Sequence, residues 1–202
     1  MKGIIKKDLY MIINYCKTYL LFLITFLVFP LIYKGASFLS AYLFLLPSMC
    51  VITIISFDEK NNWEAYFNQL PIKVEDTILA KYIIGGGISI CLLFLYSLGM
   101  CLRYGVSFIY TFATLSIVSF VSFGITMPFY FRFGSHIGRI AYYLSLGVIV
   151  FFAMQAQFNI SGSTSILPNN VSGIYVLLGI GVFIGSYFLS VIAYKIRLKK
   201  TK

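Results

Sequence analysis

Residues 56–82 read SFDEKNNWEAYFNQLPIKVEDTILAKY and interrupt an otherwise apolar chain with a long run of polar side chains. A chain that is 60% hydrophobic and 11% charged is expected to keep its polar connections short. This stretch is instead long and carries both signs of charge together with a Trp and Tyr residues. We therefore interpret it as a surface that contacts another protein. It holds five of the six acidic residues: Asp58, Glu59, Glu64, Glu75 and Asp76.

Long apolar stretches lie on both sides of this polar segment. Runs of about 18 or more apolar residues are candidates for membrane-spanning helices. Six such stretches leave no room for a separate soluble domain, so the sequence predicts one all-α transmembrane domain over residues 1–202. The six predicted spans are Cys16–Tyr33, Ala36–Phe57, Tyr82–Leu102, Ser107–Phe131, Ile140–Phe158 and Gly173–Tyr194.

The net charge of +10 is distributed in a way that predicts the orientation of the chain. If both termini are cytoplasmic, fourteen of the sixteen basic residues lie on the cytoplasmic side, and only Lys34 and Arg103 lie outside. Such a bias is typical of the positive-inside rule. It also argues against nucleic-acid binding, because the charge lies in the connections and in a solvated C-terminal tail.

The first fifteen residues have the spacing of an amphipathic helix at the membrane interface. Its apolar face includes Ile4 and Leu9, and the opposite face includes Lys2 and Lys6. Asp8 falls on the apolar face, where it is either solvated or paired locally, or else contacts a partner protein. Four charged residues are assigned to this interface helix: Lys2, Lys6, Lys7 and Asp8.

The chain lacks the side chains that catalysis would need. No Asp or Glu lies in the middle of a predicted span, and His136 is the single histidine. There is no G-x-x-x-x-G-K-[ST] motif for binding ATP. We therefore expect no enzymatic activity, no metal and no cofactor in this chain. The missing intramembrane carboxylate also argues against an ion-coupled carrier.

The polar segment resembles the corresponding region of small bacterial permeases of the ABC type 2 transporters. The resemblance rests on an acidic pair, a Trp, a Tyr, a Leu-Pro and a Lys-Tyr, together with the N-terminal sequence KKDLY. In this chain these are Asp58-Glu59, Trp63, Tyr66, Leu70-Pro71, Lys81-Tyr82 and residues 6–10. Within that family the chain is similar to membrane subunits that export phenol-soluble modulins and antimicrobial peptides.

This resemblance implies an export permease in the bacterial plasma membrane that pairs with a second permease copy. It also implies a separate cytoplasmic ATPase subunit, which would bind ATP and Mg²⁺. The coupling region would be residues 58–81. Charge reversal at Asp58 and Glu59, or truncation of Trp63, is expected to uncouple the ATPase and to spare helix packing, because these residues lie outside the bilayer. The expected coupling residues are Asp58, Glu59, Lys60, Trp63, Glu64, Tyr66, Leu70, Pro71, Lys73, Glu75 and Asp76.

The cargo and two alternative functions stay open at this point. The predicted spans offer aromatic, Ser, Thr and Gln side chains without charge, which favours an amphipathic or hydrophobic peptide over an ion. One alternative is a substrate-binding membrane subunit of a modular importer, which has a similar number of spans. The other is an immunity protein that sequesters a peptide without transporting it.

Overall fold

The computed structural model describes residues 2–15, 17–32, 39–61, 63, 74–105, 107–160 and 172–200, and these residues are almost entirely helical. Apolar runs favour helices, because a helix satisfies its backbone groups internally, and the helices here continue even through Pro47 and Pro128. The helices are α1 (Lys2–Tyr15), α2 (Lys17–Ile32), α3 (Leu39–Lys60), α5 (Val74–Tyr104), α6 (Phe108–Phe133), α7 (Ser135–Ile160) and α8 (Ser172–Lys200).

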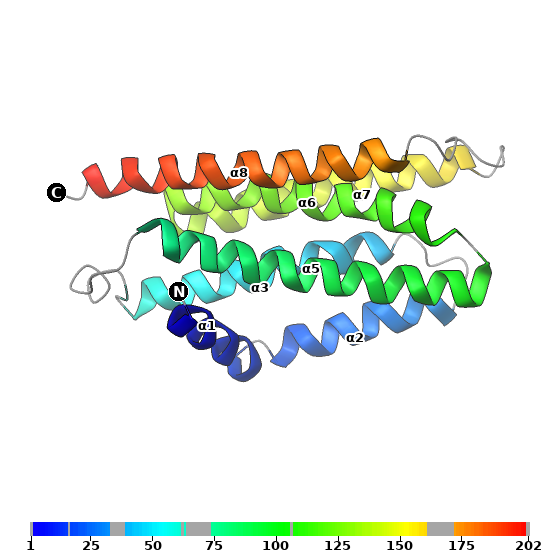
Figure 1. Cartoon of the computed structure of the whole chain (residues 1–202), viewed down its shortest axis with the longest axis horizontal. Helices are drawn as coiled ribbons and strands as arrows, with labels where there is room; N and C mark the ends of the chain where they lie inside the picture. Colours follow the sequence, from blue (N-terminus) through cyan, green and yellow to red (C-terminus); the bar gives the residue numbers. More distant parts are fainter. Residues whose placement is uncertain are drawn as a thin grey trace.

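The long helices lie side by side along one direction, and α1 lies across them (Figure 1). The C-terminal ends of α3 and α8 and the first turn of α5 lie at the left of that view. We call this the charged end of the bundle, because it holds all the ion pairs found among the described residues. At the opposite end, Arg103 Nη2 donates to the carbonyl oxygen of Ile32 at 3.4 Å.

Several helices extend beyond the apolar stretches that predicted them, and the extensions of α3 and α5 carry predicted coupling residues. The predicted span 36–57 corresponds to α3, which continues through Lys60 before Asn61 donates its backbone N–H to the carbonyl of Phe57 at 3.0 Å. The predicted span 82–102 corresponds to α5, which already begins at Val74. Neither extension contains Gly or Pro, so nothing in the local sequence ends the helix earlier. The acidic pair Asp58-Glu59 is therefore helical.

The largest cluster of buried residues in the described part of the chain joins α3, α5, α6 and α7, and α8 packs against it. The Tyr82 hydroxyl lies 2.5 Å from Ser186 Oγ and 2.7 Å from Ser190 Oγ, so a buried polar contact joins α5 to α8. The Tyr82 ring packs edge-on against Phe123 and Phe183. A Cβ atom at Gly85 would overlap the Phe123 ring, so glycine is what allows α5 to approach α6 this closely.

Among the described residues, three helical segments are both long and apolar enough to cross a membrane: Val74–Tyr104, Phe108–Phe133 and Val176–Arg197. These three correspond to the third, fourth and sixth predicted spans. The other three predicted spans also coincide with helices, namely α2, α3 and α7. The total of six spans and the placement of α1 at the membrane interface stay predictions.

Candidate coupling site at the charged end

Helix α1 presents a narrow stripe of buried residues to the bundle, formed by Ile4, Asp8 and Ile12 at intervals of four residues. In the described part of the chain Asp8 is fully buried, with 0% of its surface exposed. Its carboxylate is therefore not in contact with solvent. Leu9 is 45% exposed and lies outside this buried stripe, and its predicted place on the membrane-facing side of α1 stays a prediction. The buried stripe is centred on Asp8, whose ion-pair partners Lys7 and Lys81 lie beside it.

Those partners form a cluster of four charges, which we call the four-charge cluster: Lys7, Asp8, Asp58 and Lys81. Lys81 Nζ lies 2.6 Å from Asp58 Oδ2 and 3.4 Å from Asp8 Oδ2. Lys7 Nζ lies 2.7 Å from Asp58 Oδ1 and 3.2 Å from Asp8 Oδ1. Two carboxylates and two ammonium groups cancel in charge, which is the condition under which buried ions are tolerated. The cluster joins α1, α3 and α5.

Trp63 covers this cluster from the connection between α3 and α5. Lys7 Nζ lies 4.2 Å from the centre of the Trp63 ring, in cation–π geometry. The ring is half-buried and packs with Ile4 of α1 and Ala80 of α5. Trp63 therefore contributes to the contact between α1 and α5.

Glu59 binds the opposite side of the bundle. Its Oε2 accepts the backbone N–H of Ser135 at 3.0 Å, and its Oε1 lies 3.0 Å from Arg197 Nη1. A carboxylate at the first N–H of α7 satisfies an unpaired donor and is stabilised by the helix dipole. Gly134 has φ of 84°, and a Cβ there would lie 3.3 Å from Glu59 Oε1, so glycine allows both the turn and the contact.

The acidic pair thus contacts two different sets of helices. Consecutive residues of a helix point about 100° apart. Asp58 consequently faces α1 and α5, whereas Glu59 faces α7 and α8. The last turn of α3 is the place where both sides of the charged end are held together.

The remaining predicted coupling residues fall into three groups. Glu75 forms an exposed ion pair with Lys195 at 2.7 Å, and Asp76 is half-buried. Lys60 is exposed at the last position of α3. Five others lie outside the described residues: Glu64, Tyr66, Leu70, Pro71 and Lys73.

The expectation that Asp58, Glu59 and Trp63 lie apart from helix packing is wrong. Asp58 is only 7% exposed and contacts two lysines, and Trp63 packs between helices. The reason is that α3 and α5 extend past their apolar stretches and carry these side chains into the bundle. Of the alternatives for Asp8, the structure shows pairing, both locally with Lys7 and with the distant Lys81.

Several partners were not recognised from sequence. Lys81 is 3% exposed, although it reads as one more cytoplasmic lysine at the start of a span. Arg197 and Ser135 also escaped notice, because their contacts with Glu59 join residues far apart in sequence. One feature of the sequence did point to the contact of Lys81. Asp8 lies on an apolar helix face, and a carboxylate buried there requires a cation beside it.

Comparison with known families decides the class of the protein. The family described as ABC-2 family transporter protein matches residues 3–195. The chain belongs to the ABC-2 transporter family. It is therefore a membrane-embedded permease component of an ABC transporter, which favours the permease over the importer-subunit and immunity alternatives. No curated protein and no solved structure matches the chain.

Proposed function

We propose that this permease subunit exports amphipathic or hydrophobic peptides, driven by a separate ATPase that acts through the segment between α3 and α5. The observation that carries the coupling proposal is the double attachment of the α3 end. Asp58 and Lys81, from the helices on either side of the segment, lie 2.6 Å apart. Glu59 at the same end binds α7 and α8.

These contacts give a mechanical path through the subunit. A force on the segment would reach α3 and α5 together, because Asp58 and Lys81 tie their ends to one another. Asp8 and Lys7 would carry the same displacement to α1, and Glu59 would carry it to α7 and α8. Packed helices move as rigid elements, so a small shift at one end is transmitted along the bundle.

In this proposal the expected coupling residues have two different roles. Asp58, Glu59 and Trp63 transmit the movement inside the subunit. The ATPase is contacted by the residues around them: Lys60, Glu64, Tyr66, Leu70, Pro71, Lys73, Glu75 and Asp76. ATP and Mg²⁺ would be bound by the ATPase, which family membership implies.

The two roles are separated by reconstituting the permease with its partner ATPase. Tyr66→Ala is expected to weaken ATPase binding while leaving the Tm of the isolated permease unchanged. Glu59→Gln is expected to keep ATPase binding but to reduce transport per ATP hydrolysed. Arg132→Gln, on the exposed side of α6, is the matched control for loss of charge. Normal binding and transport by Tyr66→Ala would contradict the docking assignment.

The proposed cargo is tested in the same proteoliposomes. Amphipathic peptides are expected to stimulate ATP hydrolysis, since the apolar helices bury a peptide's apolar face at little cost, whereas an unpaired charge costs several kcal/mol. Stimulation by small hydrophilic ions, with none by amphipathic peptides, would overturn the cargo assignment.

We further propose that the working permease contains a second copy of this chain, or a related one, in contact with α8. Gly181 and Gly185 form a G-x-x-x-G motif, and no described atom lies within 4 Å of a Cβ built at either position. Such a motif lets two membrane helices approach closely. Cross-linking in membranes is expected to capture a dimer, and Gly185→Leu is expected to reduce its yield. Detection of monomers alone in transport-competent membranes would refute the dimer.

A further inference from the structure

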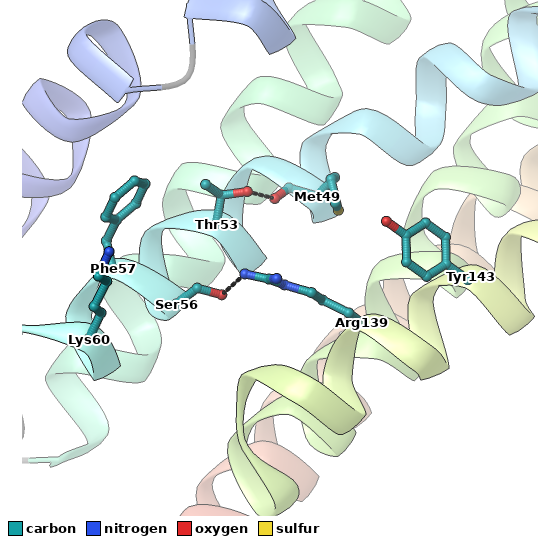
Figure 2. A pocket seen from close by; sticks show the side chains of 7 residues that line it. All are labelled: Met49, Thr53, Ser56, Phe57, Lys60, Arg139 and Tyr143. Carbon is teal, nitrogen blue, oxygen red and sulfur yellow. Dashed lines mark hydrogen bonds between the residues drawn. The ribbon is translucent and has the colours of Figure 1, made fainter.

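A second polar feature of the charged end is a pocket between α3 and α7, which shares only Lys60 with the proposed coupling residues. Its volume is about 430 Å³, within the range of small-molecule sites. Figure 2 shows Arg139 extending from α7 toward Ser56 on α3, with Tyr143 one helical turn further along α7. The lining residues are Met49, Thr53, Ser56, Phe57, Lys60, Arg139 and Tyr143.

The two cations of this pocket have no carboxylate partner in the described part of the chain. Lys60 is exposed and forms no ion pair there, and Arg139 donates only to the Ser56 hydroxyl, at 3.1 Å. Asp58 is turned toward α1 and α5, and Glu59, which does reach α7, is paired with Arg197 and the Ser135 N–H rather than with either cation of the pocket. The pocket therefore carries uncompensated positive charge.

The polarity of the pocket changes along the helix axes. Met49 and Lys60 are eleven residues apart on α3, or about 16 Å at 1.5 Å per residue. Lys60 lies at the charged end, which the charge distribution places on the cytoplasmic side, and Met49 lies deeper in the bundle. On α7, Arg139 is likewise nearer the charged end than Tyr143. The cationic part is at the predicted headgroup level, and the apolar part extends toward the membrane centre.

This arrangement matches an inner-leaflet phospholipid with an anionic headgroup, whose charged end would face the cations and whose acyl chains would face the apolar part. We propose that the pocket binds such a lipid, with its phosphate between Lys60 and Arg139 and one acyl chain along Met49 and Tyr143. Basic pockets between helices on the cytoplasmic side are suited to anionic headgroups. The bound lipid would bridge α3 and α7 close to the Glu59 contacts, and so would strengthen the attachment of α3 to α7. The lipid site does not depend on the proposed cargo. It shares Lys60 with the proposed ATPase contact, and its test contains no ATPase, so the two proposals can fail separately.

Native mass spectrometry of the purified full-length chain, titrated with phosphatidylglycerol or phosphatidylcholine, tests this site. Phosphatidylglycerol is expected to bind more tightly. Lys60→Gln and Arg139→Gln are each expected to weaken its binding about fivefold, and the double variant about 25-fold. Arg139→Lys should retain most of the affinity, and phosphatidylcholine binding should barely change in any variant.

Arg132→Gln is the matched control, because Arg132 is an exposed cation near the same end but does not line the pocket. Lys60→Gln keeps the test valid if loss of the Arg139–Ser56 bond impairs folding, since Lys60 forms no side-chain hydrogen bond or ion pair with the described residues. Equal binding of the two lipids, or an equal loss in Arg132→Gln, would overturn the proposal. Inorganic phosphate that competes as strongly as phosphatidylglycerol would also overturn it, since it would indicate a soluble anion.

Discussion

The four-charge cluster and the Glu75–Lys195 pair place the same chemical groups at similar distances in opposite surroundings. Lys81 and Asp58 lie 2.6 Å apart with side chains 3% and 9% exposed. Lys195 and Glu75 lie 2.7 Å apart with side chains 54% and 51% exposed. Both join segments that are distant in sequence, and both lie at the charged end of the bundle. The comparison separates the effect of burial from the effect of distance.

Burial changes what the loss of one partner costs. An exposed ion pair adds little to the free energy of unfolding, because water screens the attraction and both side chains lose conformational freedom when they are held together. In a buried pair, removal of one partner leaves a charge without water or a counter-ion, which costs about 3–5 kcal/mol. The buried cluster is therefore expected to be sensitive to single substitutions, and the exposed pair to be tolerant of them.

The largest effect is expected for Lys81→Met, which leaves two buried carboxylates facing one lysine. We expect a loss of about 3 kcal/mol, or a fall in Tm of roughly 6–12 °C, measured by thermal unfolding in detergent. Adding Asp8→Asn to Lys81→Met restores charge balance and should recover part of the loss. A Tm within 2 °C of the unsubstituted protein for Lys81→Met alone would show that the cluster is hydrated rather than buried.

An intermediate effect is expected at Glu59, whose contacts are partly exposed. Glu59→Ala removes both the acceptor for the Ser135 N–H and the partner of Arg197, and it should cost about 1–2 kcal/mol. Glu59→Gln retains an oxygen that can accept the Ser135 N–H, so its loss should be smaller. The same unfolding assay ranks the two variants. Equal losses of stability for Glu59→Gln and Glu59→Ala would mean that only the ion pair with Arg197 stabilises the protein, and that the hydrogen bond to the Ser135 N–H contributes nothing.

The smallest effect is expected for Glu75→Gln, which should change stability by less than about 1 kcal/mol. Raising the salt concentration should shrink this difference further, because exposed charges are screened. Unfolding at two ionic strengths, with Lys81→Met measured alongside, makes the comparison direct. A loss at Glu75 as large as that at Lys81 would remove the distinction between the two regions.

Much of the site was predictable in its residues but not in its arrangement. The acidic pair and Trp63 stand out in the sequence as polar side chains in an apolar chain. Their surroundings do not, since α3 and α5 each extend past the apolar runs and carry Asp58 and Lys81 into the bundle. A hydropathy pattern shows which part of a helix is apolar, but it does not show where the helix ends.

The sequence by itself determined the all-helical class, the positions of the long helices and the family, because apolar runs and charge spacing are local properties of the chain. Only the tertiary structure decided which charges meet. The neighbours Asp58 and Glu59 face different helices, and Asp8 meets Lys81 across 73 positions of sequence. The physical reason is that a buried charge is tolerated only next to a counter-charge, and which counter-charge is near depends on how the helices pack.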